Sequence, residues 1–588
     1  MKQHKVFFFH FFATCLFFLA SCQSDYLDKM PEAEGYDFDK VFKDSTNYRN
    51  FCDYLVQHTF FLHLENGVKP YGSWDDVSDN SISGRNSNDV PALQVANGDF
   101  YSIRTNGNAA MANNATWEQI WKHIRVANTG IMNIEHYSGS EATKQRLLGT
   151  CYFYRAFAYM DLTRRWGGMP YFYLPIDASA NMDYPRLTMR ETYKRAAADC
   201  DSAAMYLRVT IPENEFQHPT KIGALALKSR ILLYAASEQA RNEPGSDGEN
   251  LWEEAALAAD EAIRLAEDAG HELVPWADYY YIFKGGKPEI YTKEVLHGRR
   301  QSIAWGSDAY RNTIRPPGQL NGQYGGVSVN QLFVDDFEMK NGLPIEDPAS
   351  GYYEQNPYVN RDPRFEYNVL HNGSTVMNRT MQIWNETEGT SAMGSTDCQI
   401  NATGTVEMGY TRTSYYAAKW MGNTWNTVLP LLWPYIRLAE LYLNFAEASN
   451  EAWGDPAVKD GRCRYSAAEA VNKVRNRANM LDVNTKFLGQ DDFRERVRNE
   501  RRVELCFEEH RIFDIRRWKI ATQPEYRDLW RMKLVKLAAG YNAATYPTGF
   551  RYERLLERQR IFQDRHYLYV IKLNDTRIGP NFTQNPGW

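Results

Sequence analysis

Beyond its first two dozen residues, the chain contains no apolar run long enough to cross a membrane. A membrane-spanning helix needs about 20 consecutive apolar residues. We therefore expect the mature protein to be a soluble body. The sequence also lacks a low-complexity linker, a long Gly/Ser tract and any block of charge that would divide it into separate units. These absences favour one large domain over residues 22–588.

The chain has no excess of positive charge, because its 67 Lys and Arg residues are outnumbered by 73 Asp and Glu residues. A basic surface supplies most of the affinity of proteins that bind nucleic acid, so this class of function is disfavoured. The eight cysteines are scattered without the spacing of metal ligands, and we expect neither a metal site nor a cofactor. Cys151 and Cys506 lie in apolar helical stretches and should be buried thiols. Disulfides are permitted in an exported protein, but the sequence assigns none.

No catalytic motif is present: the chain has no Gly-x-Ser-x-Gly elbow, no His-Glu-x-x-His and no phosphate-binding loop. A glycoside hydrolase is not excluded by this, because its two carboxylates come from distant positions. The one arrangement that could provide an acid is Glu504 or Glu508 near His510. The same residues fall at near-helical spacing with Arg501 and Arg511, which favours a structural network of ion pairs. We predict no catalytic site.

The N-terminus combines a secretion signal with a site for a lipid. Lys2 and Lys5 give a positive start, and Val6–Ala20 is almost wholly apolar. The small residue Ser21 then precedes Cys22, as in a bacterial lipoprotein signal peptide over residues 1–21. Cleavage would leave Cys22 as the first residue, acylated by several fatty chains that together give stable anchoring. The alternative is an ordinary signal peptide that happens to contain a cysteine.

Apolar residues at helical spacing predict a mainly α fold of paired, amphipathic helices. Short connections and small residues on the buried stripes suggest antiparallel, tetratricopeptide-like pairs, although the consensus of that repeat is absent. Thr188 and Ser466 should open two of the helices through capping boxes. The expected helices cover Leu147–Trp166, Thr188–Leu207, Lys221–Ser237, Leu251–Ala269, Leu431–Ala452, Ser466–Ala478 and Asp491–Trp518.

The middle of the chain has a different character. The segment from about residue 271 to about residue 433 is rich in Gly, Asn, Pro, Tyr and Trp and has few stretches in which apolar residues recur at regular spacing. A structureless stretch of this length inside a compact domain is usually functional. We therefore expect a helical half over about 22–270, an irregular insertion over about 271–433 that carries the binding surface, and a second helical part over about 434–588.

Aromatic side chains stand beside polar ones in this insertion and in a turn-rich segment before it. The apolar face of a sugar ring stacks on an aromatic side chain, while its hydroxyls need polar partners. The alternative for any single ring is that it packs a loop onto the helices. The candidate ligand-binding residues are Trp74, Asp79, Asn80, Arg85, Trp276, Tyr280, Trp305 and Tyr324.

Several segments, in this order along the chain, carry a resemblance to one family. They are DYLD after Cys22, WKHIRVANTGIMNIE from Trp121, LLGTCYFYRAFAYMDLTRRWGGMPY from Leu147, PYIRLAELYLNFAEASNE from Pro434, AVNKVRNRA from Ala470, RNERRVELCFEEHRIFDIRRW from Arg498 and the terminal QNPGW. Together they resemble the SusD/RagB family of surface nutrient-binding lipoproteins. The chain departs from that family at Glu509, where a glycine is common, and this puts the local backbone in question.

The resemblance implies a function. It indicates a non-catalytic protein, lipid-anchored at the surface of the outer membrane, that captures glycan. The partner implied is a SusC-like, TonB-dependent outer-membrane barrel, over which the lipoprotein acts as a hinged lid. Two alternatives stay open: the same lid with peptide cargo, and a surface glycoside hydrolase.

Overall fold

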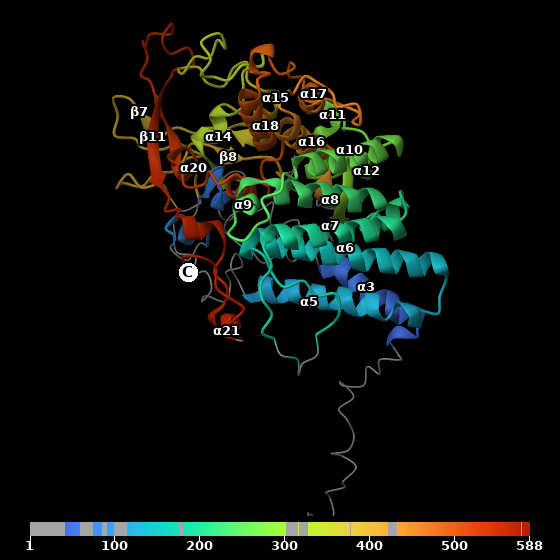
Figure 1. Cartoon of the computed structure of the whole chain (residues 1–588). Coiled ribbons are helices and arrows are strands. Elements are labelled where there is room, and N and C mark those ends of the chain that lie inside the picture. The colour runs from blue at the N-terminus through green and yellow to red at the C-terminus, as the bar shows by residue number, and fades with distance from the viewer. Residues whose placement is uncertain are drawn as a thin grey trace, which may run out of the picture.

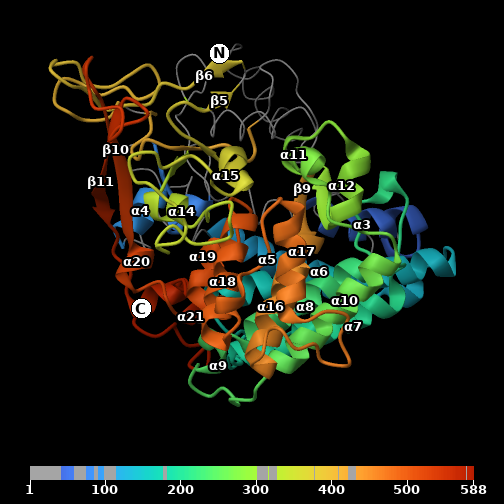
Figure 2. The ribbon, with the colours of Figure 1, turned by 90° about the horizontal axis from the view of Figure 1, so that it is seen from above.

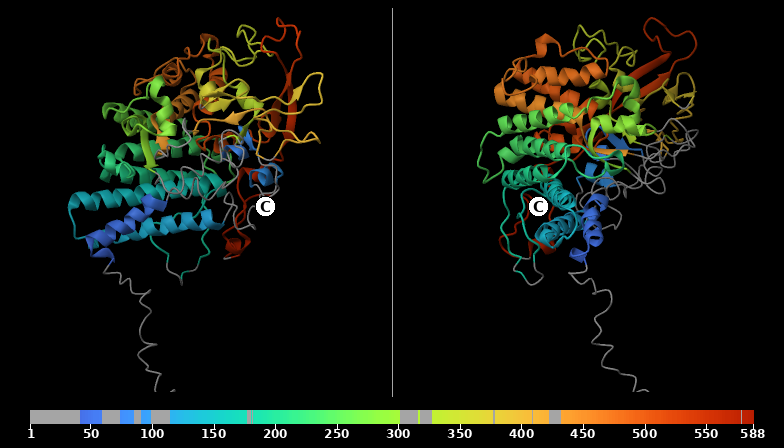
Figure 3. Two further views of the ribbon diagram at one scale, coloured as in Figure 1. Left: turned by 180° about the vertical axis from the view of Figure 1, so that it is seen from behind. Right: turned by 90° about the vertical axis from the view of Figure 1, so that its right-hand side faces the viewer.

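The computed structural model describes residues 41–58, 74–84, 91–98, 114–176, 180, 182–300, 316, 327–376, 378–407, 409–421, 432–577 and 579–588. Long helices lie side by side in a stack that rises from α5 and α6 to α16 and α17 (Figure 1). Seen end-on, the stack occupies one side of the molecule, and short elements with a long β-hairpin occupy the other (Figure 3). Among the helices that the structure describes, none combines the length and apolar character needed to cross a membrane.

The stack confirms the predicted mainly helical scaffold of paired helices. Its members are α3 (Ser45–His58), α5 (Asn114–Met132), α6 (Glu141–Trp166), α7 (Met189–Tyr206), α8 (Lys221–Ala236), α10 (Trp252–Asp268), α16 (Leu438–Trp453), α17 (Ala467–Arg477) and α18 (Gln490–Glu504). Helices α5, α6, α7, α8 and α10 each pack on the next, and α10 then packs on α16. The small residues of the predicted stripes, such as Ala196 and Ala203 of α7, are fully buried between helices.

The predicted capping box is complete at the start of α17 and only half formed at the start of α7. At α17 the Ser466 hydroxyl accepts from the Glu469 backbone N–H at 3.2 Å, and the Glu469 carboxylate accepts from the Ser466 N–H at 2.7 Å. At α7 the Thr188 hydroxyl accepts from the Glu191 N–H at 3.1 Å. The Glu191 carboxylate contacts Arg195 instead of completing the box.

Two predicted helices are wrong in part. Residues Leu432–Arg437 form strand β9, paired antiparallel with β2 (Val295–Arg300), so α16 begins only at Leu438. This opening is rich in β-favouring residues and contains a proline. The helix predicted to run to Trp518 stops at Glu504 and resumes as α19 (Arg511–Arg517). Phe507 and Glu509 lie between them with φ of +58° and +68°, the left-handed conformation that glycine adopts most easily.

The predicted insertion is irregular in its connections but holds many short elements. Its helices are α11 (Trp276–Lys284), α12 (Pro288–Glu294), α14 (Gln331–Asp335) and α15 (Pro363–Asn368), and its short strands are β3 (Val327–Val329), β4 (Val369–Leu370), β5 (Thr375–Val376), β6 (Arg379–Thr380), β7 (Glu386–Thr387) and β8 (Tyr416–Ala417). Some of its rings pack inward, as the alternative interpretation predicted. Trp420, for example, is buried and stacks on Trp433 with ring centroids 4.1 Å apart.

The remaining strands form small sheets at the periphery. β10 (Asp528–Lys536) and β11 (Phe550–Gln559) make an antiparallel hairpin, and β7 joins β10 in parallel. Figure 2 shows this hairpin at the edge of the molecule, away from α8 and α10. β1 (Ser81–Ser83) pairs antiparallel with β3. The other short helices are η4 (Trp74–Val77), η6 (Ile134–His136), η7 (Glu213–Glu215), η9 (Thr485–Phe487), η10 (Asp564–Tyr567), α4 (Pro91–Ala96), α9 (Glu238–Arg241), α20 (Pro524–Arg527) and α21 (Leu573–Thr576).

A buried cluster of charges joins α18 to the rest of the fold. Glu504 is fully buried and accepts from Arg437 at 2.7 Å, from Arg364 at 3.1 Å and from Arg477. Burial alone would raise the pKa of Glu504, but these three guanidinium charges outweigh it and hold that pKa well below its usual range. The neighbouring Glu508 accepts from Arg437 at 2.7 Å. The predicted ion-pair network is thus confirmed.

The partners within that network differ from the prediction. Arg501 donates to Asp514 at 2.8 Å, and Arg511 donates to Asp79, so neither pairs with Glu504 or Glu508. Helical spacing had placed these four charges on one continuous face, but the chain leaves the helix after Glu504. Glu504 therefore pairs with arginines from distant segments, such as Arg364 and Arg437, and Arg501 pairs with Asp514.

Candidate functional site

The structure describes the side chains of half of the sequence-predicted ligand-binding residues. Cys22, the predicted lipid attachment site, and Arg85, Trp305 and Tyr324 lie outside the described residues, and of Trp74 only the backbone, in η4, is described. Asp79, Asn80, Trp276 and Tyr280 are described in full. These four divide into an interior pair and a pair on α11.

Asp79 and Asn80 lie inside the protein and are both fully buried. Arg511 donates to the two oxygens of Asp79 at 2.8 and 2.7 Å, and Arg502 donates to Asn80 Oδ1 at 2.9 Å. Burial alone would raise the pKa of Asp79, but Arg502 and Arg511 lower it to about 2. These contacts fasten the segment after η4 to α18 and α19. We therefore give both residues a structural role and do not carry them into the proposed site.

Asp75, in η4 just before this segment, makes stability depend on pH. Its carboxyl is buried, and burial raises its pKa from 3.8 to about 7, even though Asn80 donates to it at 2.8 Å. Because the folded pKa lies above the unfolded one, this carboxyl's contribution to stability is present below about pH 4 and is lost as pH rises through 7.

We expect Asp75→Asn to be more stable than the parent protein at pH 8 and to match it more closely at pH 5. The variant amide oxygen still accepts from Asn80 and never ionises. The difference in the free energy of unfolding between variant and parent should grow by roughly 2.5 kcal/mol between pH 5 and pH 8. Denaturant titrations at the two pH values measure it. A difference that stays constant with pH would contradict the raised pKa.

Trp276 lines an open hollow of about 630 Å³. One face of its ring stacks on Tyr279, with centroids 5.3 Å apart, and Tyr367 meets it edge-on at 4.7 Å. The ring is only partly buried. Most of the other lining residues have polar groups, and the full set comprises Glu267, His271, Glu272, Leu273, Pro275, Tyr442, Lys473, Asn476, Arg477 and Asn479. Tyr280, one turn further along α11, is not part of this lining.

Glu267 holds two other polar side chains of this hollow, Tyr442 and Lys473, in place. Its carboxylate accepts from Tyr442 Oη at 2.5 Å and from Arg464 at 2.7 Å, and Lys473 lies 3.4 Å away. Burial raises the pKa of Glu267, but these donors outweigh it, so the carboxyl is ionised at neutral pH. Burial also lowers the pKa of His271, which therefore stays neutral. The hollow offers an aromatic platform with both donors and acceptors.

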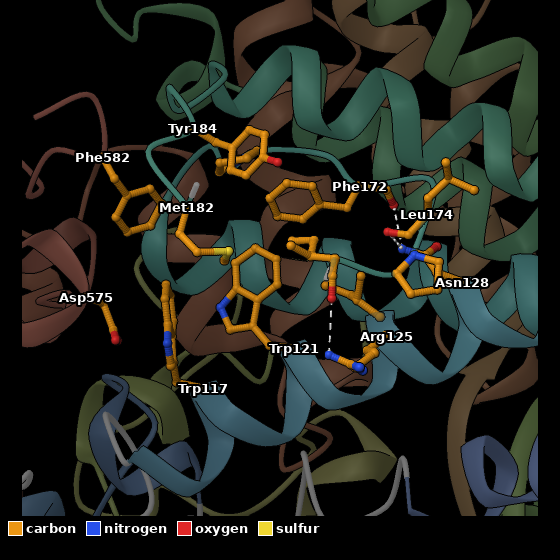
Figure 4. Close-up of a pocket in the computed structure, with 14 residues that line it drawn as sticks. Trp117, Trp121, Arg125, Asn128, Phe172, Leu174, Met182, Tyr184, Asp575 and Phe582 are labelled. Carbon is orange, nitrogen blue, oxygen red and sulfur yellow. Dashed lines mark hydrogen bonds between the residues drawn. The ribbon is translucent and has the colours of Figure 1, made fainter. Parts of the chain in front are cut away.

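A second hollow, of about 390 Å³, is aromatic and largely apolar. Figure 4 shows the rings of Trp117, Trp121, Phe172, Tyr184 and Phe582 turned toward a shared space. Two of its polar side chains hold the wall that follows α6. Arg125 donates to the Ile176 carbonyl at 3.3 Å, and Asn128 donates to the carbonyls of Phe172 and Leu174 at 2.9 and 3.2 Å. The surface of this hollow is thus mainly aromatic, with few polar side chains for a hydroxylated ligand.

None of the sequence-predicted binding residues lines this second hollow. A signal was present, because Trp117 and Trp121 are four residues apart and so share one face of α5. Phe172 and Tyr184 come from the aromatic-rich segment that follows the predicted end of α6. Within the described ranges, no group of three or more His, Cys, Asp or Glu side chains is placed to hold a metal ion.

Two family models match the chain. The one described as SusD family matches residues 294–588, and the one described as starch-binding associating with outer membrane matches residues 55–233. Among curated proteins, the chain is similar to SusD-like protein P2 of Formosa agariphila. The identity is 23% over 476 residues, which cover 77% of this chain and 83% of that protein.

Solved structures share the fold. A SusD-like carbohydrate binding protein from Bacteroides fragilis is 22% identical with a TM-score of 0.69, and the match covers 92% of this chain and all of that one. A laminarin binding SusD-like protein is 15% identical with a TM-score of 0.58, covering 93% of this chain and all of that one. At these identities the likeness shows a common architecture.

Proposed function

This chain belongs to the SusD family, and from that premise we propose that it is a lipid-anchored protein of the cell surface that binds glycan. In this proposal it delivers the glycan to a SusC-like, TonB-dependent transporter of the outer membrane. The proteins that it resembles include starch-binding, carbohydrate binding and laminarin binding ones, and these support the class of ligand.

The observation that carries the proposal is the hollow at Trp276. It joins a partly exposed ring, held by Tyr279 and Tyr367, to the ionised Glu267 and the ammonium of Lys473. Sugar rings stack on such a platform while their hydroxyls donate to carboxylates and accept from cations. Trp74, Arg85, Trp305 and Tyr324 stay predictions from the sequence.

We expect Trp276→Ala to weaken glycan binding about fivefold, which corresponds to the loss of on the order of 1 kcal/mol from one stacked ring. Calorimetry against a ligand found by screening glycans and peptides measures this change. Trp384→Ala is the matched control, because that ring is partly buried against Phe550 and lies outside the hollow. Trp121→Ala tests the apolar hollow and should leave the affinity unchanged.

The same screen separates the alternatives. Binding to peptides alone would change the class of cargo, and new reducing ends released from polysaccharides would support a hydrolase. If Trp276→Ala keeps both the affinity and the thermal midpoint of the parent, the glycan site lies elsewhere. Cross-linking in intact cells tests the transporter, since a specific complex should bury more than about 1,000 Å² and be captured with a larger membrane protein.

A further inference from the structure

Two cysteine side chains from helices far apart in sequence meet inside the protein. Cys52 of α3 and Cys151 of α6 are 99 residues apart in the chain, and their sulfur atoms are 3.6 Å apart. Both are buried, with 0% and 1% of their surfaces exposed. The other described cysteines are free thiols, and the structure holds this pair as two thiols in contact.

The neighbouring helix leaves room for these two sulfurs. Gly130 of α5 lies beside them, and a Cβ there would stand 2.6 Å from the Cys151 sulfur and 3.5 Å from the Cys52 sulfur. Glycine inside a helix costs up to about 1 kcal/mol relative to alanine, so its presence here needs a reason. The same glycine's carbonyl accepts from the Tyr48 hydroxyl of α3. The three helices thus approach closely at the point where the sulfurs touch.

We propose that Cys52 and Cys151 form a disulfide in the exported protein, fastening α3 to the helical stack. The sulfurs need to approach by about 1.5 Å to reach bonding distance. The two thiols lose two protons and two electrons, and these reduce the disulfide of a thiol–disulfide oxidoreductase to two thiols. The inference rests on the export that the proposed function requires, because only an oxidising compartment supplies that oxidant.

The disulfide would close a loop between Cys52 and Cys151 and would fix α3 at the start of that loop. Its loop contains η4, β1, α4 and α5, and so includes the turn-rich segment in which Asp79 fastens to Arg511. α3 is also the first described helix after the predicted lipid site. Mechanical force on the predicted lipid tether would therefore be transmitted from α3 to the helical stack by a covalent bond as well as by packing. The hydrogen bond between the two thiols, together with burial, raises the pKa of Cys52 well above its usual range.

Mass spectrometry of the membrane-bound, acylated protein tests the cross-link. Cells are quenched with N-ethylmaleimide, and the protein is denatured and digested without reductant. The expected result is one linked pair of peptides containing Cys52 and Cys151, with the four other described cysteines alkylated. Alkylation of both Cys52 and Cys151 in this sample would overturn the proposal while leaving the glycan and transporter proposals untouched.

A second measurement does not depend on export. The purified, reduced full chain is incubated with mixtures of reduced and oxidised glutathione, and the same linked peptides are expected to accumulate. Their absence at every ratio would overturn the proposal.

Hydrogen exchange gives the effect on the fold. A reductant should speed the exchange of α3 amides in the parent protein about tenfold or more, because the helix can then open alone. In Cys52→Ala and in the double Cys52→Ala, Cys151→Ala variant, exchange should already be fast and insensitive to the reductant. Cys200→Ala, at another buried cysteine, should respond to the reductant as the parent does. Equal exchange with and without reductant in the parent would contradict the bond.

Discussion

Glu504→Ala is expected to lower the free energy of unfolding by about 3–5 kcal/mol, the cost of removing one partner from a buried ion pair. The carboxylate is fully buried, and its loss removes from Arg437, Arg364 and Arg477 one of the buried charges that raise their pKa values. Denaturant unfolding followed by tryptophan fluorescence measures the change. Glu504→Gln, which keeps the shape, should also be destabilised, because it too removes the charge.

Glu495→Ala is the matched control on the same helix. Glu495 contacts Arg498 at 3.1 Å, but half of its side chain is exposed to solvent. Exposed pairs of this kind contribute about 0–1 kcal/mol. If Glu504→Ala costs no more than Glu495→Ala, the buried cluster does not hold α18 as its geometry indicates.

Cys22→Ala is expected to abolish incorporation of labelled fatty acid and to release the protein from membranes. The acyl chains on Cys22 are the only attachment that the sequence predicts for the mature chain. Fractionation of cells grown with the label measures both effects at once. Cys200→Ala should stay labelled and membrane-bound, because that cysteine is buried in α7. Membrane retention of Cys22→Ala without label would refute the lipid tether.

The parts of the fold that could be predicted from the sequence depend on interactions within a few residues. The capping box of Ser466 and Glu469 spans one helical turn, so four consecutive residues of the sequence are enough to predict it. The helices fail where local preference is outweighed by distant pairing, as in Leu432–Arg437, which pairs with a strand more than 130 residues earlier in the chain. The departure from glycine at Glu509 put only the local backbone in question, and the structure shows Glu509 in the left-handed conformation.

The candidate site was harder to predict for the same reason. Asp79 sits among turn residues and aromatic neighbours, as a ligand-binding carboxylate does, yet its partner Arg511 lies 432 residues away. Nothing local distinguishes a carboxylate that faces a sugar from one that fastens two segments together. Trp276 could be chosen from composition, but its companions Glu267, Tyr442 and Lys473 come from three different helices. Only the packing of those helices brings them together.

The order of the stack has a consequence for how the chain folds. Helices α5 to α10 contact their neighbours in sequence, so this half can assemble step by step, with low contact order. The face of α10 that packs on α16 must wait, because α16 begins about 170 residues after α10 ends. During that interval this face of α10, which includes Glu267, the partner of Tyr442 in α16, lies at the growing end of the stack. Assembly should therefore pause there, with a half-built molecule that exposes one face of α10 until the second helical part arrives.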